Sequence, residues 1–285
     1  MKAFFKSFLD LFIYSSFLIA LGVTLFTLES YIISGEEINT VYLQLIFWST
    51  ILIYSLHRII GVNHIKEDKF AGRFILIRSM TSLLKVIAFI SIICLIYVSS
   101  RLSRELIYII IPAGFLSLLY VLPVFGSRRM RDIHFIKIFL IALVWAYCCG
   151  IIPVMDTHGN SLSPIGYLLF LEKFIFILAI TLPFDVRDLD IDKYENVKTL
   201  ASLLGINKTY LLSNILLCVG MIILVYILNL AGLGILAITG AVISYGLTFW
   251  AVYLSRNKQS DYYFSGLLDA MIILRSAIII LFCFL

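Results

Sequence analysis

Four aspartates fall within eight consecutive residues of the stretch TLPFDVRDLDIDKYENVKTL, residues 181–200. If this stretch is helical, Asp185, Asp188 and Asp192 stand at positions i, i+3 and i+7 and share one face, while Asp190 points away from them. Carboxylate oxygens are the ligands that Mg²⁺ takes in proteins, together with waters and substrate phosphates. The spacing therefore makes a magnesium site that works on a phosphate-bearing substrate the first chemistry to consider.

The elements that position this cluster are apolar and long. The chain has 285 residues, of which 62% are hydrophobic and 14% charged, with a mean hydropathy of +1.05. Soluble domains are roughly 45–50% apolar and about 25% charged, so this composition indicates an integral membrane protein. The apolar runs are long enough to cross a bilayer as helices and lack the alternation of barrel strands.

We predict an all-α, polytopic membrane protein in which residues 1–285 form a single domain, with nine transmembrane helices around one chamber. The predicted spans are residues 9–28, 41–57, 79–99, 105–123, 135–154, 165–184, 209–229, 232–254 and 264–285.

The basic residues predict the orientation of the chain. Seventeen of the 22 Lys and Arg residues lie in the segments on one side of the membrane, three lie within spans, and only Arg101 and Arg104 lie on the other side. Because positively charged loops stay in the cytoplasm, the N-terminus is predicted inside and the C-terminus outside, in a bacterial cell membrane. The basic face attracts membrane lipids and anionic substrates, and no nucleic-acid partner is expected.

The aspartates then lie in an inner loop at the mouth of the sixth span, where their mutual repulsion needs a compensating charge. Basic residues of the same loop would supply it in an ordinary solvated loop, and these are Arg187, Lys193 and Lys198. Acidic residues are scarce elsewhere in the chain, and a membrane mouth with basic residues nearby suits a phosphate. We therefore favour a bound metal ion. The five cysteines show no CxxC spacing and indicate neither disulfides nor a metal site.

The stretch DVRDLDIDKYENVKTLASLLG, residues 185–205, resembles the second aspartate-rich motif of the UbiA superfamily of intramembrane prenyltransferases. That motif is D-x-x-D-x-x-x-D, followed by a basic residue, by T-L-A and by L-G. A second stretch, LLYVLPVFGSRRMRDIHFIKIFLIALVWA at residues 118–146, is similar to the family's fourth span, basic loop and fifth span. The family architecture of nine helices with aspartate motifs on the cytoplasmic side also agrees with the predicted topology.

The resemblance implies transfer of a polyprenyl group from its diphosphate to a lipid-soluble, membrane-confined acceptor, with an aromatic acceptor expected. Mg²⁺ would bridge the diphosphate to Asp185, Asp188 and Asp192, which are then both catalytic residues and metal ligands. Arg187, Lys193 and Lys198 would contact the diphosphate, and Lys198 matches the family's basic position best. An apolar chamber would shield the allylic cation from water.

The chain departs from the family at the second span, where YSLHRIIGVNHIKEDKF stands at residues 54–70. The family's first motif is N-x-x-x-D-x-x-x-D, and its three positions carry Tyr54, Arg58 and Val62. Arg58 has a planar fork suited to phosphate and would replace a metal by a fixed charge. His57 would bind phosphate or accept a proton. We therefore expect weaker Mg²⁺ dependence than two full motifs would give.

Two alternatives stay open at this stage. A descendant of the family with no catalysis or with altered chemistry would keep the chamber and bind an isoprenoid, and the missing first motif favours it. A transporter is less favoured, because no internal repeat is seen. Charged residues within the spans are expensive in lipid, and among them Glu172 and Arg275 are a possible pair.

Overall fold

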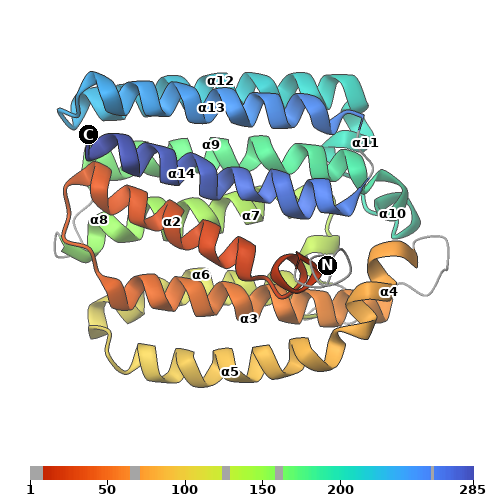
Figure 1. Cartoon of the computed structure of the whole chain (residues 1–285). Helices are drawn as coiled ribbons and strands as arrows, with labels where there is room; N and C mark the ends of the chain where they lie inside the picture. The colour runs from red at the N-terminus through yellow and green to blue at the C-terminus, as the bar shows by residue number, and fades with distance from the viewer. Residues whose placement is uncertain (1–8, 65–70, 124–128, 158–162, 258–259) are drawn as a thin grey trace, which may run out of the picture.

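The computed structural model describes residues 9–64, 71–123, 129–157, 163–257 and 260–285. Within these residues it is helical and contains no strand, and nine segments are long and apolar enough to cross a membrane. Figure 1 shows these helices lying side by side along one direction. The predicted all-α membrane architecture is confirmed.

The membrane-spanning segments are α2 (Phe17–Ser34), α3 (Thr40–His64), α5 (Thr81–Ser99), α6 (Arg104–Val121), α7 with η3 and α8 (Ile136–Ala146, Tyr147–Ile151, Ile152–Thr157), α9 (Pro164–Arg187), α12 (Ile206–Leu230), α13 (Ile235–Ser255), and η4 with α14 (Tyr263–Leu268, Asp269–Cys283). The short helices named below are α4 (Ala71–Ser79), η2 (Met130–Asp132), α10 (Leu189–Tyr194) and α11 (Leu200–Leu204). In Figure 1, α4, α10 and α11 lie at the same end of the bundle, called the α10 end below.

The first span differs from its predicted range of 9–28. Residues 9–14 are helical, but the helix then breaks, because Ser16 has a left-handed backbone with φ of 73°. Such a conformation is rare for a residue with a side chain and cannot continue a right-handed helix. The span therefore begins at Phe17 and ends at Ser34, where Gly35, with a positive φ of 70°, closes the helix. Among the other spans the largest difference is at the end of the second, predicted at residue 57, whereas α3 continues to His64.

Helix α9 carries the first of the clustered aspartates, and it continues through an internal proline. Pro183 has no N–H, so the carbonyl of Ala179 loses the hydrogen bond it would receive from that position. The Ser213 hydroxyl of α12 donates to this carbonyl at 2.7 Å. The freed backbone group is thus satisfied by a neighbouring helix, and α9 runs on to Arg187, where it presents Asp185.

Four charged side chains meet inside the bundle and form the buried ion cluster: Glu29, Glu172, Lys173 and Arg275. Arg275 Nη1 lies 2.7 Å from Glu29 Oε2, Lys173 Nζ lies 3.4 Å from Glu29 Oε1, and Arg275 also contacts Glu172 directly. All four side chains are fully buried. The pair predicted between Glu172 and Arg275 is confirmed. Two negative and two positive charges balance, which makes the cluster tolerable in an apolar interior.

Candidate functional site

A cavity of about 300 Å³ opens between α3, α7, α9 and α14 near the α10 end. This volume lies at the lower limit of ordinary ligand pockets. Residues of α3, α7 and α9 nearer the α10 end line it with charged groups, and residues deeper in the bundle line it with apolar ones. The apolar part includes Ile53, Ile138, Ile141, Val144 and Trp145. The cavity therefore suits a ligand with a charged head and a hydrocarbon tail.

The acidic wall of the cavity is formed where α9 passes into α10. Asp185 and Asp192 are only 1% and 3% exposed, and both line the cavity together with Asp188. Asp190 is exposed and lies outside the lining, as its position on the helix predicts. Asp188 occupies the junction between the two helices and is held by Arg187 through two contacts of 2.9 Å.

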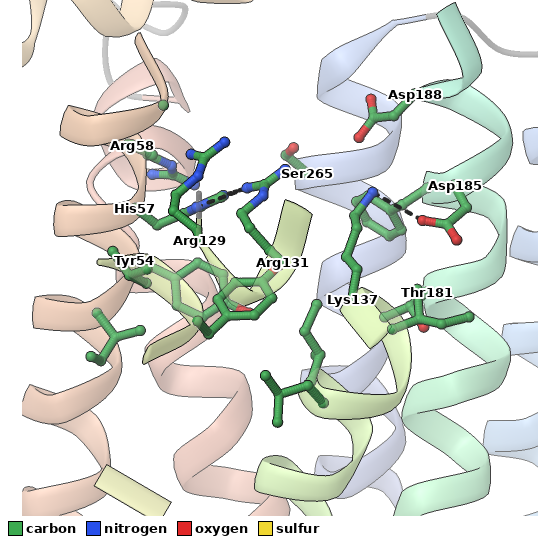
Figure 2. A pocket seen from close by; sticks show the side chains of 18 of the residues that line it. Tyr54, His57, Arg58, Arg129, Arg131, Lys137, Thr181, Asp185, Asp188 and Ser265 are labelled. Atoms are coloured by element: carbon green, nitrogen blue, oxygen red, sulfur yellow. Dashed lines mark hydrogen bonds and ion pairs between the residues drawn. The ribbon is translucent and has the colours of Figure 1, made fainter. Parts of the chain in front are cut away.

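Lys137, at the start of α7, reaches this acidic wall. Its Nζ lies 3.0 Å from Asp185 Oδ1 and 3.6 Å from Asp192 Oδ2, and Figure 2 shows the ammonium beside Asp185. Burial raises the pKa of Asp192 to about 6, although the nearby ammonium acts in the opposite direction. Two of the three aspartates on the acidic wall thus share one lysine.

The opposite, basic wall carries three arginines (Figure 2). Arg129 is tied to Asp132 by contacts of 2.9 and 3.0 Å, and its Nη2 lies 3.9 Å from Glu195. Arg131 places Nη1 2.6 Å from Nε2 of His57. Asp132 is held ionised, because the hydrogen bonds and charge of Arg129 outweigh the effect of burial and lower its pKa. Arg129 is therefore largely neutralised by the protein itself.

Arg58 differs from Arg129 in its partners. Its Nη1 donates to the Ser16 hydroxyl at 3.2 Å, and its guanidinium lies 5.6 Å from the ring centre of Tyr14. Both partners are neutral, and no carboxylate within ion-pair distance of Arg58 is found in the described part of the chain. Arg58 thus keeps a positive charge that is available to an anion in the cavity.

The residues predicted from sequence fall into two groups. Asp185, Asp188, Asp192, His57, Arg58 and Arg187 all line the cavity. Lys193 and Lys198 are exposed and do not, and the backbone N–H of Lys198 donates to His134 Nδ1. Tyr54, Arg58 and Val62 all line the cavity. The face of α3 that carries the three positions of the first motif is therefore turned toward the cavity. The chemical roles of all these residues stay predictions.

Five charged lining residues were not predicted as site residues: Arg129, Arg131, Lys137, Glu195 and Asp269. The first three lie in the stretch 118–146, whose basic loop was noted only as part of the resemblance. A lysine one residue inside an apolar span is a signal for a buried partner, and Asp269 carries the same signal within the last span. Asp269 forms no hydrogen bond or ion pair with the described residues, and the charges of Arg187 and Arg58 act on it.

The cavity aspartates are of the right type for a hard cation, but their arrangement is not that of a metal site. Oδ1 of Asp185 and Oδ2 of Asp192 are buried without a hydrogen-bond partner, as ligands awaiting a cation would be. The Lys137 ammonium, however, lies at both atoms. In the residues that the structure describes, no three His, Cys, Asp or Glu side chains are placed to hold a metal ion. The ammonium therefore stands where a bridging ion would have to lie.

Several solved structures share this fold. A UbiA homologue from Aeropyrum pernix K1 aligns over 92% of this chain and 97% of its own, with a TM-score of 0.65 and 13% identity. A digeranylgeranylglyceryl phosphate synthase aligns over 98% and 96%, with a TM-score of 0.56 and 15% identity. A UbiA homologue from Archaeoglobus fulgidus, bound to GPP and Mg²⁺, aligns over 95% and 97%, with a TM-score of 0.57 and 12% identity.

A search of curated proteins finds no match to the chain. The sequence profile of the UbiA prenyltransferase family, in contrast, matches residues 73–271. This range includes α5 to α13 and the start of α14, and with them the whole acidic wall and both arginines of the loop before α7. By its sequence and by its fold, the chain belongs to the UbiA prenyltransferase family.

Proposed function

We propose that this prenyltransferase takes a polyprenyl diphosphate as donor and a lipid-soluble, aromatic molecule as acceptor. The observation that carries the proposal is the cavity itself, with charged walls toward the α10 end and an apolar lining deeper in the bundle. A prenyl diphosphate has the same division between a charged head and a hydrocarbon tail. The Archaeoglobus fulgidus homologues bound to GPP and to DMAPP support a donor of this class.

The diphosphate lies, in this proposal, between the two walls. Arg58 and Arg131 offer planar donor groups from one side, and the Lys137 ammonium offers donors from the other. The prenyl chain then extends along the apolar residues of α3 and α7, among them Ile53 and Ile141. The tail excludes water from the reacting carbon.

In the reaction, the bond between the allylic carbon and the diphosphate oxygen breaks, and its electron pair leaves with the diphosphate. A new bond forms between that carbon and the acceptor, which loses a proton. The rings of Tyr120 and Trp145 line the cavity and stabilise the allylic cation through their π faces. Asp269 is the cavity carboxylate that we assign to receive the proton.

Three further predictions from the sequence remain proposals. The first is divalent metal use, which Mg²⁺ and Cd²⁺ in homologue structures support for the family. The sequence assigns the ion to Asp185, Asp188 and Asp192, but the Lys137 ammonium lies between Asp185 and Asp192 in the structure, so the place of the ion is not assigned to these residues here. A divalent ion, when bound, neutralises the leaving diphosphate. The second is that the α10 end faces the cytoplasm, as the distribution of basic residues indicates. The third is that residues 1–285 form one domain.

A protein that binds an isoprenoid without transferring it is the second candidate, favoured by Arg58 at a position where the family motif has aspartate. The test incubates purified protein with prenyl diphosphates of several lengths and a membrane lipid extract, with and without Mg²⁺. Pyrophosphate release is measured, and lipids are analysed by mass spectrometry. Release with a new prenylated lipid supports the transferase. Release with a free alcohol or a cyclised hydrocarbon supports altered chemistry, and tight binding without turnover supports the second candidate.

A further inference from the structure

Lys137 is an unusual residue for its position, because it is a lysine in the first turn of an apolar helix and only 9% exposed. Most lysines at the end of a membrane span extend toward water. This one points instead toward α9 and α10, where its Nζ lies 3.0 Å from Asp185 and 3.6 Å from Asp192. Figure 2 shows the contact with Asp185.

The three buried charges depend on one another. An isolated ammonium or carboxylate is costly to bury, and the cost falls only when an opposite charge lies close by. Asp185 and Asp192 come from different helices, α9 and α10, and would repel each other without the ammonium. Lys137 thus performs the two tasks of a bridging metal ion, since it joins two carboxylates and offsets their repulsion.

We propose that Lys137 is a built-in cation that takes the place of a divalent ion between Asp185 and Asp192 and links these carboxylates to the diphosphate of the donor. The proposal rests on the proposed function, since it concerns how the prenyl diphosphate is held. It predicts that the diphosphate binds without a divalent metal ion.

The donor groups of Lys137 suit this role. An ammonium has three N–H donors, and Nζ of Lys137 lies near both carboxylates without a hydrogen bond of good geometry to either, so a donor remains for a phosphate oxygen in the cavity that Lys137 lines. Across the cavity, Arg58 stands at a position of the first motif that is aspartate in the family pattern. One wall has therefore lost its carboxylates by substitution, and the other has its carboxylates occupied by an ammonium. Both changes replace an exchangeable ion by a fixed charge.

A metal–diphosphate complex that displaces Lys137 is the competing arrangement. Charge balance would allow it, because five acidic and five basic side chains line the cavity. The two arrangements differ in what binding requires. A fixed ammonium holds the diphosphate in the presence of a chelator, whereas a displaced ammonium leaves binding dependent on the metal.

The test measures binding of a non-hydrolysable geranylgeranyl thiolodiphosphate by calorimetry, in EDTA and in Mg²⁺, to the full-length protein in detergent. Wild type is expected to bind with affinities in the two buffers that agree within about threefold. Lys137→Met should bind about tenfold or more weakly in EDTA and recover in Mg²⁺, which enters the vacated position. Lys137→Arg should keep binding in EDTA. Lys208→Met, which removes an exposed lysine at the start of α12, is the matched control and should behave as wild type.

Wild type that binds the analogue only with Mg²⁺ would overturn the role of Lys137 and leave the proposed function standing. Wild type that binds it in neither buffer would overturn the proposed function. A second measurement uses wild type alone, so it does not require that a variant folds. Electron paramagnetic resonance detects Mn²⁺ binding to the protein in the absence of diphosphate. Weak binding is expected, because the ammonium holds the ligands, and tight binding at the aspartates would contradict the proposal.

Discussion

Replacing Arg58 by methionine should weaken donor binding while leaving the fold intact. In the structure Arg58 gives one 3.2 Å hydrogen bond to Ser16 and lies 5.6 Å from the ring centre of Tyr14. Because the donor is a cation, the hydrogen bond contributes about 1.5–3 kcal/mol, and the cation–π contact adds about 0.5–2 kcal/mol. The stability lost is therefore about 5 kcal/mol at most, and it is reduced because methionine also removes the cost of burying the guanidinium. A charged hydrogen bond to phosphate contributes about 1.5–3 kcal/mol, so the dissociation constant should rise about 10- to 150-fold.

The assay is calorimetric binding of the thiolodiphosphate analogue, with thermal unfolding followed on the same samples. Arg101→Met is the matched control, since Arg101 also lies over a tyrosine ring, Tyr97 at 5.8 Å, but in the turn between α5 and α6 at the other end of the bundle. The control should show wild-type affinity. If Arg58→Met bound the analogue as tightly as wild type while remaining folded, the assignment of the basic wall to the diphosphate would be wrong.

Three other predictions concern stability and donor length. The raised pKa of Asp192, about 6 against an unfolded value near 3.9, means that the native state holds an extra proton between these values. Stability should fall as the pH rises from about 4 to 6, by about 2–3 kcal/mol, and Asp192→Asn should flatten this slope in thermal unfolding while the exposed Asp190→Asn does not. Glu172→Gln should destabilise the bundle by about 3–5 kcal/mol, because it leaves Arg275 underpaired in an apolar interior; denaturation that matched wild type would contradict this. Val144→Trp should fill the apolar part of the cavity and restrict turnover to shorter donors, as measured by mass spectrometry of the products. If the longest products were unchanged, the prenyl chain of the donor would not lie along Val144.

The spans could be predicted from the sequence because about 20 apolar residues in a row have few options other than crossing a bilayer. The start of the first span could not, since the break depends on the left-handed backbone of Ser16, and serine does not signal that conformation. The face shared by Asp185, Asp188 and Asp192 followed from helical spacing, although the helix is interrupted at Asp188.

The partners of those aspartates could not be predicted. The sequence predicts that basic residues of the same loop compensate the charge of the aspartates. Arg187 does contact Asp188, but Lys193 and Lys198 are exposed. The charge at Asp185 comes from Lys137, a different span, through the packing of α7 against α9. Helical periodicity shows which residues share a face of one helix. It does not predict which residues of two helices distant in sequence contact each other.

The buried ion cluster joins residues that are synthesised at very different times. Glu29 is synthesised with the first span, and its closest partner, Arg275, belongs to the last, 246 residues later. Lys173, which lies 3.4 Å from Glu29, is synthesised 144 residues after it, so Glu29 has no partner from this cluster during the first half of translation. Glu172 meets Arg275 only when the last helix follows. A ribosome that stops before α14 therefore releases a chain with an uncompensated charge in lipid. The last helix therefore completes the charge balance that the first helix begins.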